Sequence, residues 1–485
     1  MTTSVVDPPG GALLREPPLA ADASGTPGLV DVSIEARIAP AVVNGQPANL
    51  LTYDGSFIAP TIRANPGDAV MLRFRNGLPY TTETNILGHR KNVTNVHVHG
   101  LHVSPGNDMA TGLPADDVHI PVEPGGGALT YRYDLCNQRP GSLALYHPHV
   151  HGTVAEQFWG GLVGIIDVGD GPISALASYP ASLLVLKDIS IANGAPAPYT
   201  MTGEYMQGKE GDVVMVNAQV NPYLPVQPGE VRRFRIVNAS TARFYRVSLQ
   251  GHTMHVVGTD GGLLDRPYPV SEILLASGER VDVLVPVTTA TGDYKLLALP
   301  YARRGNMTTP QITLMTVRVK GSRVSQALPA VVNPAAVRLA DDPMLPRPRF
   351  VLSMGQGRGY INGVSFDVLP DGTIVSDEHH STVGTDEVWE IVNQSGMDHP
   401  WHQHVNDAQV LSISGGDAAY ASYARLHTSI PGFKDTIIVP KWGSVTFRLP
   451  IRDHTGMTMY HCHILEHEDI GMMGMWHIMD GGMPM

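Results

Sequence analysis

Near its C-terminal end the chain reads His461-Cys462-His463-Ile464-Leu465-Glu466-His467, and a methionine, Met472, follows five residues later. On an extended strand side chains alternate between two faces, so Cys462 would point to one face while His461 and His463 point to the other. A thiolate, two imidazoles and a weak axial thioether are the donors of a trigonal copper site. We therefore expect this short segment to bind two different metal centres. The alternative is a histidine-rich turn around a buried structural cysteine.

Three further His-x-His pairs lie upstream of this segment: His97-Val98-His99, His147-Pro148-His149 and His402-Gln403-His404, the last preceded by His399. On an extended backbone both imidazoles of a pair lie on one face, as ligands of adjacent metals must. A single pair could equally be a solvated strand face. Four pairs, however, supply three imidazoles for each of two metals and two for a third. The donors left over for a fourth metal are His399, Cys462, His467 and Met472.

Four segments carry these donors in order: HVHG at 97–100, HPHVHG at 147–152, HPWHQH at 399–404 and HCHILEHEDIGM at 461–472. They resemble the copper motifs of the three-domain multicopper oxidases, the family of laccases, bilirubin oxidases and bacterial copper-efflux oxidases. The resemblance implies four copper ions: one type 1, one type 2 and a type 3 pair. It assigns the type 1 ion to His399, Cys462, His467 and Met472, and the type 2 ion to His97 and His402. The type 3 pair falls to His99, His147, His149, His404, His461 and His463.

Length and composition predict an all-β protein of three domains. A chain of 485 residues is too long to fold around a single hydrophobic core. Its 51 Gly and 39 Pro separate short stretches in which apolar and polar residues alternate, such as 70–75 and 231–237. Gly67, Gly229 and Gly384 each precede an Asn by nine residues and lie roughly 160 residues apart. We expect three consecutive cupredoxin-like Greek-key β-sandwich or barrel domains, over residues 1–170, 171–330 and 331–485. Chance similarity of strand and turn signals is the alternative explanation of the repeat.

The distribution of the donors predicts where the metal centres lie. The first domain holds two His-x-His pairs, the third holds the other two and the whole type 1 set, and the middle domain holds none. A cluster of three copper ions must then lie between the first and third domains. We expect the middle domain to be a spacer, and we expect His151, which extends the second motif, not to be a ligand.

Charge and cysteine content narrow the class of partner. A net charge of -12 offers no basic face for nucleic acid, and the absence of an apolar run near twenty residues argues against a membrane span. With Cys462 committed to copper, Cys136 has no disulfide partner.

Residues 1–15 show no signal-peptide pattern, so we expect either a cytoplasmic chain or an exported one, periplasmic or secreted, whose leader was removed. A monomer is favoured.

The resemblance also implies a reaction. Electrons from a reductant would enter at the partly exposed edge of His467, leave through Cys462, and reduce dioxygen to water. Asp108 and Glu468 match carboxylates that supply protons near the trinuclear cluster; for Asp108 the alternative is a turn residue. We expect a laccase-like oxidase of phenols or aryl amines, with a metallo-oxidase acting on Cu(I) or other metal ions as the runner-up. A copper-storage or electron-transfer cupredoxin, or a nitrite reductase, would not need so many His-x-His pairs.

Overall fold

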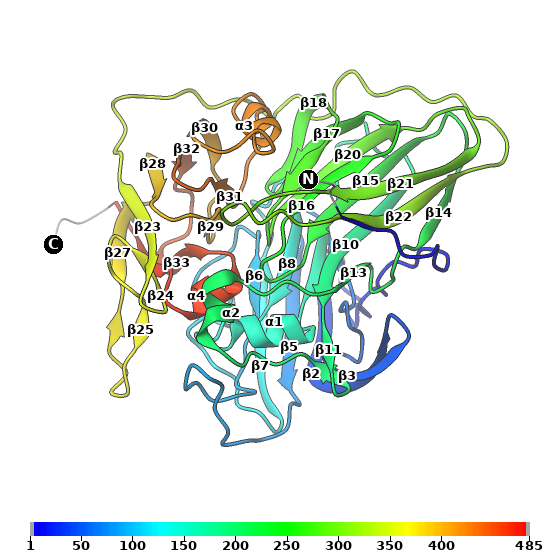
Figure 1. The fold of residues 1–485 in the computed structure, drawn as a ribbon. Coiled ribbons are helices and arrows are strands. Elements are labelled where there is room, and N and C mark those ends of the chain that lie inside the picture. The colour runs from blue at the N-terminus through cyan, green and yellow to red at the C-terminus, as the bar shows by residue number, and fades with distance from the viewer. Residues whose placement is uncertain (1–3, 482–485) are drawn as a thin grey trace.

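The computed structural model describes residues 4–481 and consists of strands with a few short helices. Figure 1 shows three β-sandwiches that follow one another along the chain, coloured blue to cyan, green, and yellow to red. The predicted all-β class with three cupredoxin-like domains is confirmed. The helices are α1 (Val154–Gly160), α2 (Thr202–Gln207), α3 (Ala421–His427) and α4 (Leu465–Asp469).

The first sandwich pairs two four-stranded sheets. Its strands alternate in burial: in β5, Val70, Leu72 and Phe74 are buried while Arg73 and Arg75 are exposed, which is the pattern of a sheet with one face in the core. One sheet has the order β3 (Gln46–Tyr53), β2 (Leu29–Val43), β5 (Ala69–Asn76) and β7 (Gly127–Asp134). The other has the order β4 (Ile62–Ala64), β9 (Gly164–Val168), β8 (Leu143–His147) and β6 (His97–His99).

The middle sandwich pairs two six-stranded sheets. One has the order β13 (Val213–Val216), β10 (Ala181–Ile189), β15 (Val231–Asn238), β20 (Arg280–Pro286), β17 (Met254–Thr259) and β18 (Gly262–Val270). The other has the order β1 (Val5–Val6), β22 (Gln311–Val319), β21 (Gly292–Leu299), β16 (Tyr245–Leu249) and β19 (Ile273–Leu275), with β14 (Tyr223–Val226) also on β22. Strand β1 therefore pairs with the middle sandwich, although our prediction counted it in the first domain. A small ribbon of β11 (Ile191–Ala192) and β12 (Ala195–Pro196) stands apart.

The third sandwich pairs two five-stranded sheets. One has the order β24 (Arg358–Ile361), β23 (Arg349–Gly355), β28 (Asp386–Asn393), β32 (Ser444–Pro450) and β30 (Gln409–Ser414). The other has the order β27 (Asp377–Thr382), β34 (Met473–Met479), β33 (Gly456–Cys462), β29 (His399–Gln403) and β31 (Thr436–Val439). A hairpin of β25 (Asp367–Val368) and β26 (Ile374–Val375) projects beside them.

The glycine and asparagine repeat marks the same structural position in each sandwich. Gly67, Gly229 and Gly384 all have positive φ, and each begins the turn into β5, β15 or β28. Each strand ends on an Asn, and the three Asn side chains make equivalent hydrogen bonds. Every one donates from Nδ2 to two backbone carbonyls and accepts at Oδ1 from the backbone N–H two residues further on: Asn76, Asn238 and Asn393. The repeat is therefore structural, because each Asn fixes the chain that leaves its strand.

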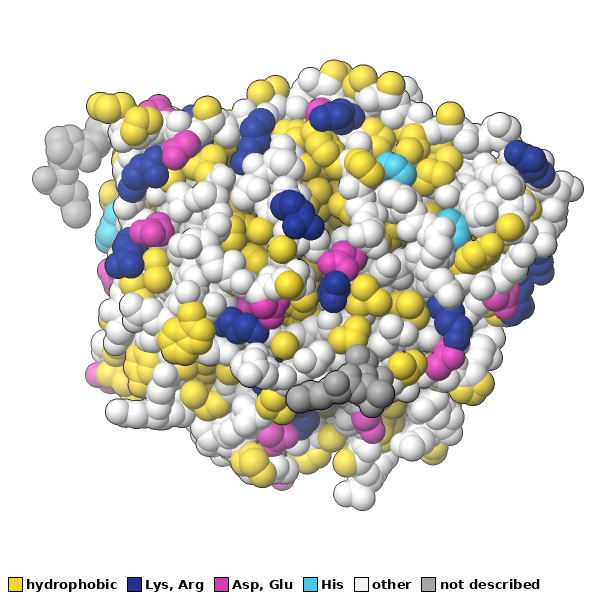
Figure 2. Space-filling view, turned by 45° about the horizontal axis from the view of Figure 1, so that its top comes forward, with side chains coloured by type: hydrophobic (Ala, Val, Ile, Leu, Met, Phe, Trp, Pro, Cys, Tyr) yellow, Lys and Arg dark blue, Asp and Glu magenta, His cyan; other side chains and the backbone are white. Residues whose placement is uncertain are grey.

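Three further features of the described residues bear on our predictions. No helix within residues 4–481 has the length and hydrophobicity that crossing a bilayer requires. Cys136 is exposed and has no disulfide partner, as predicted, and Cys462 is buried. On the face drawn in Figure 2, Lys and Arg side chains are scattered among hydrophobic and neutral ones, several of them beside Asp or Glu.

Candidate metal centres

The first candidate centre, which we call the Cys462 group, consists of His399, Cys462 and His467. The register of β29 against β33 sets Trp401 opposite Cys462 and so brings His399 near the thiol. His399 Nδ1 lies 3.3 Å from Cys462 Sγ and 3.1 Å from His467 Nδ1, and the Sγ to His467 Nδ1 distance is 3.5 Å. Burial raises the pKa of the Cys462 thiol. Because only a thiolate is a good ligand, a metal ion here must displace that proton.

Met472 and His467 adjoin this group through the backbone. The Met472 N–H donates to the carbonyl of His467 at 2.9 Å, and the Met472 carbonyl accepts from the Cys462 N–H at 3.0 Å. His467 is fully buried, at 0% exposure, so our expectation of a partly exposed imidazole edge is wrong. The reason is α2, which packs on α4 and sets the backbone of Met206 beside the His467 ring. Figure 1 shows α1 and α2 beside α4, where the three sandwiches meet.

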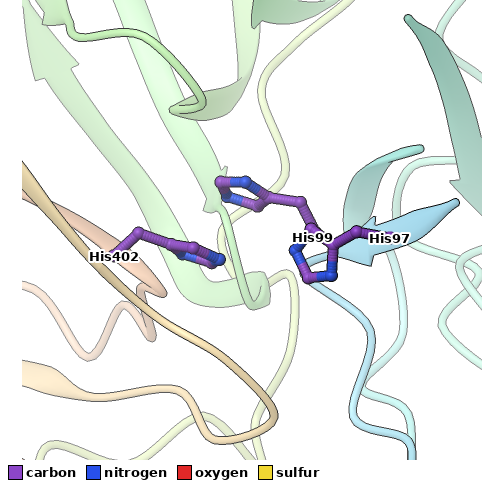
Figure 3. Close-up of side chains that lie close together, drawn as sticks. All are labelled: His97, His99 and His402. Atoms are coloured by element: carbon purple, nitrogen blue, oxygen red, sulfur yellow. The ribbon is translucent and has the colours of Figure 1, made fainter. Parts of the chain in front are cut away.

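The eight histidines of the His-x-His pairs converge between the first and third sandwiches. In the first, β6 pairs with β8 so that His97 is opposite His147; in the third, β29 pairs with β33 so that His402 is opposite His461. Figure 3 shows His402 approaching His97 and His99 from the other side. The ligating atoms lie within 4.8 Å of one another in each of three groups: His97, His99 and His402; His99, His147 and His463; His149, His404 and His461.

The imidazoles present lone pairs to one another. His97 Nδ1 is bonded to Asp116 at 2.9 Å, His147 Nδ1 to the carbonyl of Pro148 at 2.8 Å, and His402 Nδ1 to the carbonyl of Asp435 at 2.9 Å. Each ring therefore donates from Nδ1, which leaves Nε2 as an acceptor, and all three Nε2 atoms are buried without a hydrogen-bond partner among the described residues.

Other pairs of ring nitrogens in these groups face each other directly. His404 Nε2 lies 3.2 Å and His149 Nε2 lies 3.3 Å from His461 Nε2. Burial lowers the pKa of these rings, to about 4 for His147, so they are neutral. Buried lone pairs aimed at one another repel unless a cation lies between them. The donor sets therefore fit metal ions: a thiolate with two imidazoles in one centre, and imidazoles alone in the others.

Three carboxyl groups contact the histidines, and only one of them, Glu468, was predicted; the contact of Asp435 with His99 is described below with the middle sandwich. Glu468 Oε2 lies 3.3 Å from His461 Nδ1, and its Oε1 lies 3.6 Å from His149 Nε2. Both oxygens are buried without a hydrogen-bond partner among the described residues, and burial raises the pKa of Glu468 well above its usual range. The second carboxyl is Asp116, which also accepts from the Val98 N–H at 3.0 Å.

Asp108 does not join the histidines in this structure. Its side chain accepts from the Thr111 hydroxyl at 2.6 Å and pairs with Arg132 at 3.1 Å, while its backbone closes a turn with Gly112. No hydrogen bond or ion pair within residues 4–481 connects it to a histidine, so the turn alternative describes it. Asp116 takes the place beside the cluster. It follows no His-x-His pair closely and shows no local signal in the sequence.

The middle sandwich does more than separate the other two. Ser277 Oγ lies 3.1 Å from His463 Nδ1, and Arg280 pairs with Asp435, which accepts from His99 Nε2 at 2.9 Å. Burial alone would raise the pKa of Asp435, but the Arg280 guanidinium holds it well below the usual range. At Gly278 a Cβ atom would lie 2.8 Å from the His99 ring and 2.9 Å from the His463 ring. These residues position the cluster, although nothing in their local sequence predicts it.

Comparison with known proteins agrees with this geometry. Models of the family described as multicopper oxidase match residues 36–172, 179–322 and 351–481. A laccase of Bacillus subtilis is 28% identical over 479 residues, covering 90% of this chain and 91% of the relative. A multicopper oxidase of Staphylococcus aureus is 26% identical over 441 residues, covering 89% and 84%.

Solved structures extend the likeness to the whole fold. A multicopper oxidase from Campylobacter jejuni described as a metallo-oxidase superposes with a TM-score of 0.80 at 26% identity, covering 98% of each chain. A bacterial laccase-like multicopper oxidase from Ochrobactrum sp. gives 0.76 at 26% identity, covering 96% of this chain and 100% of that one. With the family models matching all three sandwiches and the donor groups assembled as above, the chain belongs to the multicopper oxidase family of oxidoreductases.

Proposed function

We propose that the protein is a laccase-like oxidase that takes single electrons from phenols or aryl amines and delivers them to dioxygen. The observation that carries the proposal is a covalent link between two kinds of metal group. Cys462 belongs to one group, and its chain neighbours His461 and His463 belong to two others. Three successive residues thus join an electron-accepting site to a site built from imidazoles. The relatives named laccase support the choice of reaction.

Members of this family use four copper ions, and the donor groups of this chain fit them. We assign the type 1 ion to His399, Cys462, His467 and Met472, and the type 2 ion to His97 and His402. The type 3 pair is assigned to His99, His147, His149, His404, His461 and His463. When bound, the copper ions supply one-electron acceptance at the Cys462 group and, at the imidazole groups, the reduction of one dioxygen by four electrons and four protons to two waters.

The protein's own residues would provide the electron path between the groups, the orientation of the ligand histidines and the protons for oxygen reduction. The backbone from Cys462 to His461 and His463 is the electron path between the groups. Glu468 can hold a proton on either unpartnered oxygen beside His461 and His149. Asp116 would orient His97 through Nδ1 and keep its Nε2 free for a ligand bond. In this proposal Asp116 replaces Asp108.

The reductant would bind in a pocket of about 370 Å³ beside α1, because α2 covers His467 itself. Trp159 and Tyr199 line this pocket and suit an aromatic ring. The Tyr199 hydroxyl donates to Glu466 Oε1 at 2.7 Å, and Glu466 directly precedes His467. An electron from the pocket would reach the Cys462 group along these contacts.

Oxidation of metal ions is the second candidate, and one observation favours it. The helix that covers His467 follows the exposed Met201 and includes Met206, whose backbone lies beside the ring and whose side chain is partly buried. Thioethers prefer Cu(I), so a metal-ion reductant could deliver its electron through α2. The structural relative described as a metallo-oxidase supports this reading.

Oxygen uptake tests the proposed reaction. The purified copper-loaded protein is expected to be blue and to consume one dioxygen for every four electrons donated by a phenol, without releasing peroxide. Cys462→Ser should abolish both the colour and the activity. A wild-type protein that is fully copper-loaded but colourless would contradict the type 1 assignment.

A substitution in the pocket separates the two substrates. Ile86 lines the pocket and is 44% exposed, so Ile86→Trp should narrow the pocket without disturbing the core. We expect KM for a bulky phenol to rise about tenfold while the rate of Cu(I) oxidation stays unchanged. A tenfold weaker binding of the phenol corresponds to the loss of about 1.4 kcal/mol, the contribution of one modest contact. Ile38→Trp, at a residue 48% exposed on β2, is the matched control. If Met206→Leu slows Cu(I) oxidation while Ile86→Trp leaves phenols unaffected, the metallo-oxidase candidate holds instead.

A further inference from the structure

A second pocket lies beside the trinuclear cluster and takes no part in the proposed reaction. It holds about 310 Å³ and is lined by His149, a member of the cluster, together with His89, His119 and His151 and the methionines Met459 and Met473. The histidines come from loops of the first sandwich, and the methionines come from β33 and β34 of the third. Imidazoles and thioethers therefore face one space that also reaches a cluster histidine.

The methionines belong to a row that the strand register produces. On β33, Met457, Met459 and His461 lie at alternate positions and so share a face. The antiparallel β34 sets Met475 opposite Met459 and Met473 opposite His461. Residues directly opposite each other have Cβ atoms about 5 Å apart on one face. We call these four residues the methionine row: Met457, Met459, Met473 and Met475.

The row extends from the partly exposed Met457 to the cluster. Met459 and Met473 are each 1% exposed, and Met475 is 5% exposed. Met459, Met473 and Met475 pack with Val118 and Phe366 in a small cluster of their own, outside the main core of the sandwich. Flexible thioethers thus form a row that ends opposite His461, and two of them, Met459 and Met473, line the pocket.

One histidine of the pocket has a free nitrogen atom, and a second imidazole lies beside it. His151 Nδ1 is buried and has no hydrogen-bond partner among the described residues. The His89 ring lies 5.2 Å from the His151 ring, centroid to centroid, at 82°. The His89 ring packs directly against Gly152, where a Cβ atom would lie only 2.2 Å from His89 Cδ2. Because residue 152 is a glycine, with a φ of +81°, there is room for the ring. The local backbone therefore accommodates a second imidazole beside His151.

We propose that this pocket is a fifth copper site, which binds Cu(I) through His89, His151, Met459 and Met473 and delivers it to the group of His149, His404 and His461. Thioethers and neutral imidazoles select Cu(I) over the hard divalent ions. The ion enters and leaves as Cu(I), so no electron is exchanged in the transfer. The two ends of the methionine row serve the two steps, because Met457 is partly exposed to solvent and Met473 is paired with His461. This loading role goes beyond the oxidase reaction and does not depend on which reductant is used.

Equilibrium binding tests the site. The four-copper protein, reduced and free of oxygen, is titrated with Cu(I) against a coloured Cu(I) chelator, and in parallel with Ag(I) as a redox-inactive substitute. We expect the wild type to retain one ion beyond four. His89→Phe, and the double variant Met459→Leu with Met473→Leu, should weaken retention at least about tenfold, because even an outer partner of a metal site contributes that much. Met315→Leu, at a buried methionine of the middle sandwich, is the matched control.

Loading kinetics test the route. Copper-free protein is supplied with Cu(I) or with Cu(II) and bound copper is measured over time; the blue colour is read at the end, after air has oxidised the loaded copper to Cu(II). His89→Phe and the double variant should take up Cu(I) into the trinuclear cluster about tenfold more slowly than wild type and Met315→Leu, while Cu(II) loading is equal in all four proteins. The blue colour confirms that each variant has folded. Absence of a fifth ion in the wild type, or Cu(I) loading at the wild-type rate in both variants, would overturn the proposal.

Discussion

The guanidinium group of Arg280, in the middle sandwich, donates to both carboxylate oxygens of Asp435, from Nη1 to Oδ1 at 2.6 Å and from Nη2 to Oδ2 at 2.5 Å. Asp435 in turn accepts from His99 Nε2, and its carbonyl accepts from His402 Nδ1. One buried ion pair thus orients a histidine from the first sandwich and another from the third. The middle sandwich, which provides no member of the groups described above, fixes the geometry between the other two.

Removal of Arg280 should therefore destabilise the protein and its cluster together. Arg280→Met leaves Asp435 buried without its counter-charge, which costs about 3 to 5 kcal/mol. Urea unfolding and copper analysis of the purified variant measure the two effects, and we expect copper to be lost from the histidine groups first. Arg318→Met is the control, since its pair with Asp293 is largely exposed and should contribute less than about 1 kcal/mol. If the two variants lost equal amounts of stability and copper, the buried ion pair of Arg280 and Asp435 would have no special role.

Gly278 is expected to tolerate no side chain. Its φ of +82° disfavours other residues, and a Cβ would press on the rings of His99 and His463. Gly278→Ala should lower the copper content of the trinuclear cluster while the Cys462 group keeps its blue colour. Gly305→Ala is the matched control, because Gly305 also has positive φ but no atom within 4 Å of the added Cβ. If Gly278→Ala bound its full complement of copper, the expected clash of the added Cβ with the His99 and His463 rings would be contradicted.

Met472 is predicted to set the reduction potential of the Cys462 group. A thioether donates weakly to copper and stabilises its oxidised state, so Met472→Leu should raise the potential. Redox titration of the blue absorption measures this. Met473→Leu serves as the comparison, since Met473 lies opposite His461 and lines the second pocket rather than the Cys462 group. If Met473→Leu shifts the potential and Met472→Leu does not, the axial assignment passes to Met473.

Glu468 should matter for oxygen reduction more than for copper binding. Glu468→Gln keeps the size of the side chain but removes the proton-carrying carboxyl, so we expect four copper ions, normal reduction of the type 1 site and reoxidation slowed by about 10 to 100-fold. Rapid-mixing absorbance with dioxygen follows each step. Asp108→Asn is the control and should reoxidise at the wild-type rate, because Asp108 contacts Thr111 and Arg132 instead of the cluster. Slow reoxidation in Asp108→Asn alone would reverse this assignment.

The sequence by itself determined the donor sets and the repeated sandwich. A strand has a side-chain period of two, so His461, Cys462 and His463 reveal from their order alone that two groups share one segment. The glycine and asparagine repeat likewise marks a local turn and strand, which recurs with the same hydrogen bonds at Asn76, Asn238 and Asn393. Such features are readable because their geometry is set by neighbours in the chain.

Only the tertiary structure decided which other residues surround those donors. Asp116 rather than Asp108 meets His97, and α2 buries His467, because loops between strands take their positions from packing and not from local spacing. Arg280 reaches Asp435 from 155 residues away along the chain. Burial makes such distant contacts strong, since charges and lone pairs removed from water must find partners within the protein, yet a partner from another sandwich leaves no pattern in either segment.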